Sequence, residues 1–177
     1  MTFFDTSFSY TTVCARMTAV TLALFLLTAA AVHADPMGDA GSETEAIMTA
    51  MIPVGTHMLE QQGQFTPYGG AMTPDGKVVA VEEYDRTKPP PSEEIITTLQ
   101  THFRAGALTG KYKATGLFSD VEVVPPGGTE KTHAIAAALD HRDNYSVVIY
   151  FPYKIVAGKV EFDQVSALPG ENRLFLK

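Results

Sequence analysis

The sequence predicts an α+β protein in which a mostly antiparallel sheet of about five or six strands carries two helices on one face. Three observations support this class. Strand-like segments follow one another through short turns, which favours antiparallel pairing. Two segments have helical spacing and helix-start signals. These two segments are inserted among the strands and do not alternate with them, so the expected element order is α-β-β-α-β-β-β.

The N-terminal segment 1–34 is expected to be a secretory signal peptide. Arg16 precedes an uncharged apolar run of 16 residues, 17–32, which is shorter than the roughly 20 residues needed to span a bilayer. Residues 32–34, Val-His-Ala, have the form of a signal-peptidase cleavage site. Cleavage is therefore expected after residue 34, and an uncleaved membrane anchor is the alternative.

Processing would leave a short flexible leader, 35–41, and a single α+β domain, 42–177, in the bacterial periplasm or outside the cell. The only cysteine, Cys14, lies within the signal, so the mature domain is expected to have no disulfide. The formal net charge of −7 gives no electrostatic attraction to nucleic acid. No stable membrane insertion is expected after cleavage, and Met17 is an alternative to Met1 as the start.

The first helix is expected to begin at Ser42, which forms a capping-box pattern with Glu45. Apolar residues recur along it at three- and four-residue spacing, namely Ile47, Met51, Val54 and Met58. Pro53 is expected to kink or split this helix, because proline removes a backbone donor and crowds the preceding turn. Gly63 is the expected end.

Two short hairpins are expected on either side of the middle of the chain. Segments 65–72 and 77–84 are strand-like and flank Thr-Pro-Asp-Gly at 73–76, which is typical of a tight turn. Near the C-terminus, a further strand pair is compatible with the pattern around Ala-Gly at 157–158. The tail from Leu168 is expected to be irregular.

The second helix is expected to begin with Ser92 as its cap. Its buried stripe is expected to consist of Ile96, Leu99 and Phe103. Gly106 or Gly110 should end it, and a strand is expected over 112–124.

The segment 132–153 is expected to form two strands at the centre of the sheet, joined by a four-residue loop, 141–144. Such a loop would place Tyr145 on the same face as Asp140, directly opposite it. Residues 130–141 also admit a helix, because the segment is alanine-rich and satisfies helical spacing. The strand is preferred because an emphatic strand follows only a short loop later.

Several short motifs resemble a pattern shared by small uncharacterised bacterial proteins. They are FTPYGG at 65–70 and DG at 75–76, then LDHRD at 139–143, YSV at 145–147 and PY at 152–153. The resemblance spans most of the mature chain and supports the hairpins. It transfers no function to this protein.

Strong catalytic and metal-binding signatures are absent from the sequence. There is no HExxH or HxH pattern, no GxSxG elbow and no glycine-rich nucleotide loop, so no catalytic residue, metal or cofactor is assigned. His141, Arg142 and Asp143 sit in an expected turn, where together they offer a base, an anion-binding group and an acid. The alternative function is a small periplasmic hydrolase or ligand-binding domain whose site would use His133, Asp140, His141 and Arg142.

The sequence favours another function over that one. Tyr68, Tyr84 and Tyr153 are candidates for a binding surface, since tyrosine is common at protein interfaces. Together with the acidic charge, small size and expected export, they predict a non-catalytic protein-interaction module that binds a protein of unknown identity. An inhibitor or immunity-type protein directed at a basic toxin or hydrolase is one concrete form.

Overall fold

The structure is a computed structural model that describes residues 36–82, 84 and 88–175. The expected signal peptide, its cleavage site, Cys14 and the alternative starts all lie outside these residues. The described residues belong to one compact unit. Within them, neither helix combines the length and apolar character needed to cross a membrane.

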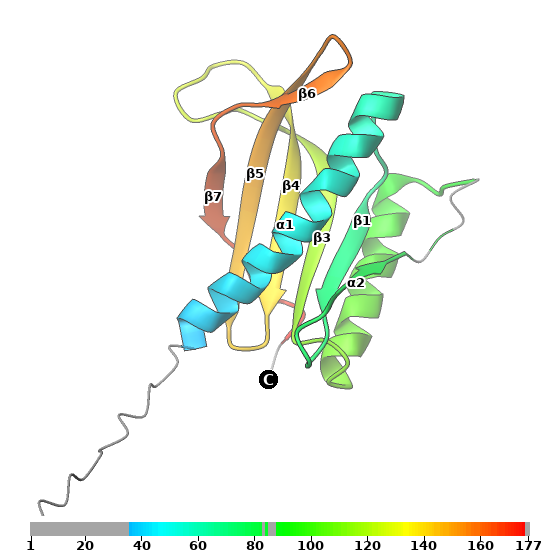
Figure 1. The fold of residues 1–177 in the computed structure, drawn as a ribbon, viewed down its shortest axis with the longest axis vertical. Coiled ribbons are helices and arrows are strands. Elements are labelled where there is room, and N and C mark those ends of the chain that lie inside the picture. The colour runs from blue at the N-terminus through cyan, green and yellow to red at the C-terminus, as the bar shows by residue number, and fades with distance from the viewer. Residues whose placement is uncertain (1–35, 83, 85–87, 176–177) are drawn as a thin grey trace, which may run out of the picture. The chain divides into compact units, whose positions relative to one another are not determined.

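A single antiparallel sheet and two helices make up this unit, which confirms the predicted α+β class (Figure 1). The strand order is β2–β1–β3–β4–β5–β6, and β7 pairs with β5 on the side away from β4. Among the described residues the elements are α1 (Pro36–Gln62), β1 (Tyr68–Met72), β2 (Val78–Val81), α2 (Ser92–Leu108), β3 (Ala114–Val123), β4 (Thr132–His141), β5 (Tyr145–Val156), β6 (Lys159–Phe162) and β7 (Ser166–Pro169).

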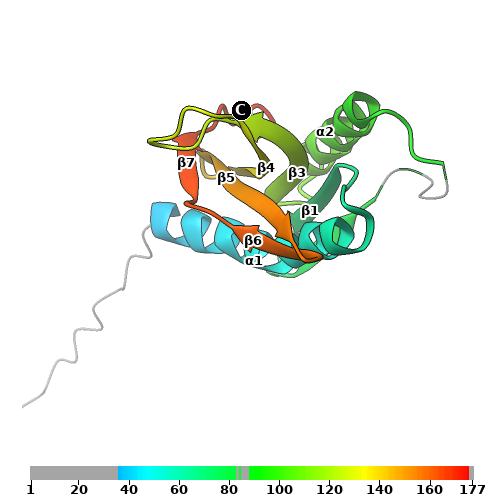
Figure 2. The same ribbon diagram turned by 90° about the horizontal axis from the view of Figure 1, so that it is seen from above.

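The two helices cover opposite faces of the sheet (Figure 2), so the expectation that both lie on one face is wrong. Adjacent residues of β3 show the reason. Phe118 packs in the cluster under α1, whereas Leu117 packs against the cluster under α2. Side chains alternate across a strand, so β3 is apolar on both faces and each face needs its own cover.

Helix α1 begins earlier than expected and continues through its proline. Ser42 is not its cap, because the Ser42 hydroxyl donates to the carbonyl of Gly38 one turn earlier within the helix. Pro53 lies on the exposed side, and the helix is continuous around it. Gly63 ends the helix as expected, with a positive φ of 70° that a residue without a Cβ adopts readily.

Helix α2 starts at Ser92, but its cap position is Pro91, and no side chain caps the helix. The expected role of Ser92 as the cap is therefore wrong. Leu99 and Phe103 are buried as expected, and Ile95 is buried where Ile96 was expected. The helix packs mainly on β1 and β3, with Val81 of β2 in the same apolar cluster, which leaves the β4–β5 half of this face without a helix.

The β4–β5 hairpin confirms the strand over the helix for 132–141 but corrects the predicted register. His141 pairs directly with Tyr145, so the loop has three residues instead of four. Asn144 closes it with φ of 61°, a conformation that asparagine tolerates better than most residues. A shift of one residue moves every facing partner, so Tyr145 shares a face with His141 and Asp140 faces Ser146.

Both other expected hairpins are present. The turn between β1 and β2 closes with a hydrogen bond from the N–H of Gly76 to the carbonyl of Thr73. Residues 157 and 158 form the turn between β5 and β6. The tail is not irregular from Leu168, because β7 extends to Pro169; residues after it form no further strand or helix up to residue 175.

Candidate binding cleft

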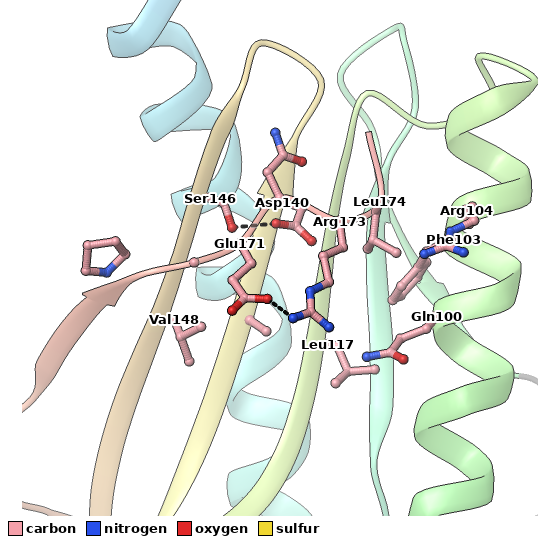
Figure 3. Close-up of a pocket in the computed structure, with 14 residues that line it drawn as sticks. Gln100, Phe103, Arg104, Leu117, Asp140, Ser146, Val148, Glu171, Arg173 and Leu174 are labelled. Carbon is pink, nitrogen blue, oxygen red and sulfur yellow. Dashed lines mark hydrogen bonds and ion pairs between the residues drawn. The ribbon is translucent and has the colours of Figure 1, made fainter. Parts of the chain in front are cut away.

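A cleft of about 540 Å³ lies on the α2 face of the sheet, where α2 leaves β4 and β5 uncovered (Figure 3). Helix α2 forms one wall, strands β3, β4 and β5 form the floor, and residues 169–174 form the other wall. The cleft therefore depends on three segments that are far apart in the sequence and are brought together by the sheet.

The floor is a row of three apolar residues across neighbouring strands. Leu117 of β3 pairs with Ala138 of β4, which pairs with Val148 of β5. All three line the cleft. A methyl group between two larger side chains leaves a hollow at the middle of this apolar row.

The next row across the same strands is polar. Thr115, Asp140 and Ser146 are consecutive partners in β3, β4 and β5. The Ser146 hydroxyl donates a hydrogen bond to Oδ1 of Asp140 over 2.6 Å. Burial raises the pKa of Asp140, and this hydrogen bond opposes the rise only in part. No lysine, arginine or histidine among the described residues lies within ion-pair distance of this carboxylate.

Two buried oxygen atoms near this polar row lack hydrogen-bond partners in the described part of the chain: Oγ1 of Thr115 and Oδ1 of Asn172. Thr115 is fully buried directly opposite Asp140. Asn172 lines the cleft, and its amide group donates to the carbonyl of His141 over 3.3 Å. Buried polar atoms are usually paired. Thr115 is not part of the lining, so the unpaired oxygen that calls for an explanation at the cleft is Oδ1 of Asn172.

Arginine side chains border the cleft from both walls. Arg173 forms an ion pair with Glu171 within the tail. Arg104 extends from α2, on the other side of the floor from Asp140 (Figure 3). Arg104 has no hydrogen bond or ion pair with any described residue. The four charged residues at the cleft therefore balance formally, with one carboxylate and one guanidinium left without an ionic partner.

The tail that forms the second wall is attached on both sides of Asn172, whose amide also bonds to the carbonyl of His141. The N–H of Gly170 donates to the carbonyl of Ser146 over 3.0 Å. Leu174 packs against the apolar cluster under α2. Because these contacts are with β5 and α2, the tail spans the cleft instead of extending into solvent.

His141 is on the other face of the sheet, in a buried polar cluster with α1. Its Nε2 lies 2.9 Å from Oε2 of Glu43, and Nζ of Lys113 lies 2.5 Å from the other oxygen of that carboxylate. Its Nδ1 accepts the backbone N–H of Asp143 over 3.1 Å, which assigns the proton to Nε2. Both ring nitrogens thus have internal partners, and the imidazole joins α1 to the hairpin.

The pKa of Glu43 shows how well this cluster is paired. Burial alone would raise it, but the hydrogen bonds and charges of Lys113 and His141 outweigh burial and lower it.

Arg142 and the carboxylate of Asp143 are exposed on the loop. The carboxylate of Asp143 is 3.6 Å from Nδ1 of His141, so the expected base and acid are neighbours, but the base is enclosed.

His133, Asp140, His141 and Arg142 do not converge on one site. His133 and His141 are on the α1 face of β4, whereas Asp140 is on the α2 face. His133 is exposed beyond the end of α1, with Nδ1 3.2 Å from Oδ2 of Asp120. Residues an odd number apart on one strand point to opposite faces, which separates them.

The three tyrosines also occupy separate environments. Tyr68 is buried, and its hydroxyl donates to the carbonyl of Met51. Burial raises the pKa of this hydroxyl. The hydroxyl of Tyr84 is hydrogen-bonded to that of Thr66, and the mostly buried Tyr153 donates to Asp120. Tyr68 and Tyr84 line one hollow and Tyr153 lines another, so they form no common exposed patch.

No local sequence pattern marks Arg104, Asn172 or Arg173, because a tail that folds back over a sheet leaves no periodic signal. Among the described residues, no three His, Cys, Asp or Glu side chains are grouped so that they could hold a metal ion. Comparison of the chain with protein-family models, with curated proteins and with solved structures finds no match.

Proposed function

We propose that this protein is a non-catalytic binding module and that the cleft between α2 and the tail holds a small organic ligand with an apolar body. One observation carries the proposal: an apolar hollow at Ala138 leads directly to a partly buried carboxyl group, Asp140, that lacks a cation. Ligand sites usually combine an apolar lining with a few polar groups that fix orientation.

The size and composition of the cleft support this use. A volume of about 540 Å³ is within the roughly 300–1,000 Å³ of small-molecule sites. The hydroxyl of Ser146 donates a hydrogen bond to Asp140. No described histidine lines the cleft to act as a base for this hydroxyl. Binding therefore requires fewer assumptions than acyl transfer, which needs a nucleophile oriented by a base.

Filling the hollow tests the proposal. Ala138→Leu adds three carbon atoms at the centre of the floor and should displace any ligand that uses it. We expect ligand-observed NMR with a library of small amines, alcohols and carboxylates to detect binders that lose at least tenfold in affinity in this variant. Ala167→Leu, at an exposed position of β7, is the control. Unchanged binding by Ala138→Leu would contradict the cleft as the site.

A protein partner is a second candidate function, favoured by the distribution of exposed apolar side chains. Among the described residues, five of the seven exposed large hydrophobic residues lie between 155 and 168, on β5, β6, β7 and their connections: Ile155, Val156, Phe162, Val165 and Leu168. Of these, Ile155 and Phe162 share the α1 face of the β5–β6 pair, and exposed apolar groups that lie together can mark an interaction surface. The charge of −7 supports a basic partner, and export and an inhibitor or immunity-type role are proposed with it.

Substitutions in this surface separate apolar binding from charge steering. We expect Phe162→Ser to weaken capture of a partner from the envelope at least tenfold, and Leu108→Ser, an exposed residue of α2, to leave it unchanged. Capture that survives high salt in the wild type would fit the apolar surface, because salt screens only the charges. A partner retained equally by both variants would exclude this surface.

A further inference from the structure

We propose that the polar end of the cleft binds a primary ammonium group carried on an apolar stem. The inference rests on the proposed function of the cleft and names the chemistry of its ligand. The stem would lie over Ala138, and the ammonium group would lie beside Asp140, one row further along the same strand.

The first argument is charge. Asp140 is held in the sheet with a serine hydroxyl as its hydrogen-bond partner and with no cation among the described residues. An enclosed carboxylate without a counter-charge is unfavourable, and a cation supplied by a ligand removes that cost. Arg173 does not supply it, since its guanidinium is paired with Glu171 (Figure 3).

The second argument is hydrogen bonding, and it is independent of charge. Oγ1 of Thr115, which faces Asp140 in the adjacent strand, and Oδ1 of Asn172 are both buried and unpaired. Both atoms accept hydrogen bonds, and a primary ammonium group carries three N–H donors. Of these two acceptors only Asn172 lines the cleft, so the ammonium group could satisfy Asp140 together with Oδ1 of Asn172, whereas an alcohol has one donor and a carboxylate has none.

Arg104 sets what the other end of the ligand can carry. Its guanidinium has no ionic partner and borders the opposite side of the floor. A neutral or anionic far end is therefore compatible with the cleft, and a second cation there is disfavoured. The ammonium can come from a free amine or from the side chain of a lysine in a partner protein, because both present the same group on the same aliphatic stem.

The proposal has a defined pH dependence. An ammonium group binds the ionised form of Asp140, whose pKa in the free protein is raised by burial. Affinity should therefore increase as pH rises through that pKa and level off above it. By reciprocity the bound ligand should lower the pKa of Asp140.

NMR titration of the whole processed protein tests the inference with n-butylamine, n-butanol and Nα-acetyl-lysine methylamide as probes. We expect n-butylamine to bind at least tenfold more tightly than the isosteric n-butanol. Asp140→Asn should abolish that preference, and Asp143→Asn, an exposed carboxyl of the same hairpin, should retain it. Binding of the lysine derivative in addition supports a protein source, and its failure beside butylamine binding supports a free amine.

Failure of the ammonium group and failure of the cleft give different results. If n-butanol binds as well as n-butylamine and Ala138→Leu removes both, the cleft is a ligand site and the ammonium inference is overturned. If Asp140→Asn binds n-butylamine as well as the wild type, the inference is also overturned. If no probe shifts the resonances of Leu117 and Val148, both the inference and the proposed site fail.

Discussion

Two carboxylates near the same end of the sheet, Glu43 and Asp140, differ in almost every respect. Glu43 is held by Lys113 and by His141, and its pKa is lowered. Asp140 follows Leu139 in β4 and faces the opposite side, where Ser146 is its hydrogen-bond partner and burial raises its pKa. His141 and Asp140 are adjacent in one strand. His141 belongs to the paired network under α1, whereas Asp140 belongs to the cleft and has no cationic partner among the described residues.

The difference fits a structural role for the α1 face and the binding role proposed for the α2 face. Under α1 the polar groups satisfy one another, so the cluster fixes the helix on the hairpin and leaves nothing for a ligand. On the α2 face, buried oxygens of Thr115 and Asn172 remain unpaired, and leaving a buried acceptor unpaired costs about 1–3 kcal/mol. Such a cost is expected where a ligand later provides the missing partner.

The largest effect expected from this comparison is in packing. Leu139 is fully buried on the α1 face, whereas Val148 is only partly buried on the floor of the cleft. Leu139→Ala should lower the free energy of unfolding by about 2–5 kcal/mol through lost burial and a residual cavity. Val148→Ala should cost about 1 kcal/mol, because less apolar surface leaves water in the folded state. Urea denaturation measures both.

Equal costs at the two positions would contradict the comparison, since they would mean that the floor of the cleft is as tightly packed as the covered face. The m-value must stay constant for the two free energies to be compared. A change in m would indicate that the variant also alters the compactness of the unfolded or folded state.

Most strands and both helices were predictable from local signals. The placement of the helices on opposite faces and the register of the central hairpin were not. The glycine-containing turns at 73–76 and 157–158 identified two hairpins correctly, because such turns need particular backbone conformations. The register of the central hairpin depended on whether His141 belonged to the loop or the strand. His141 is in the strand because Glu43 and Lys113 enclose it, and these partners are distant in sequence.

Part of the site was predictable for the same reason. Asp140 was predicted as a site residue of the central hairpin, together with His133, His141 and Arg142, and the cleft does contain it. His133 and His141 were grouped with Asp140 because they are close in sequence. They lie on the other face, because side chains alternate along a strand. The tail was expected to be irregular from Leu168, so its return across the sheet, with Asn172 and Arg173, could not be inferred.

A smaller change in stability, with a defined pH dependence, is expected from Glu43→Gln. The lowered pKa of Glu43 means that it contributes stability above its unfolded-state pKa, and that this contribution is lost as pH falls through the folded-state pKa. Glu43→Gln should therefore cost about 1–3 kcal/mol near neutral pH, because it leaves the ammonium of Lys113 without its charged partner. The cost should vanish in acid, where the wild-type carboxylate is also protonated.

Asp140→Asn should behave in the opposite way. A raised pKa means that Asp140 contributes most stability below its unfolded-state pKa and loses it as pH rises through the folded-state pKa. The amide keeps an acceptor for Ser146 and carries no charge, so the variant should be at least as stable as the wild type near neutral pH, with a gain below about 1 kcal/mol. The gain should disappear in acid.

Melting temperatures of Glu43→Gln and Asp140→Asn should be measured between pH 3 and 8, roughly the range in which carboxyl groups titrate. The two curves should diverge from the wild type in opposite directions. Two curves that fall on the same side would mean that Asp140 is paired in the free protein, and the unpaired carboxylate on which the ammonium site depends would not exist.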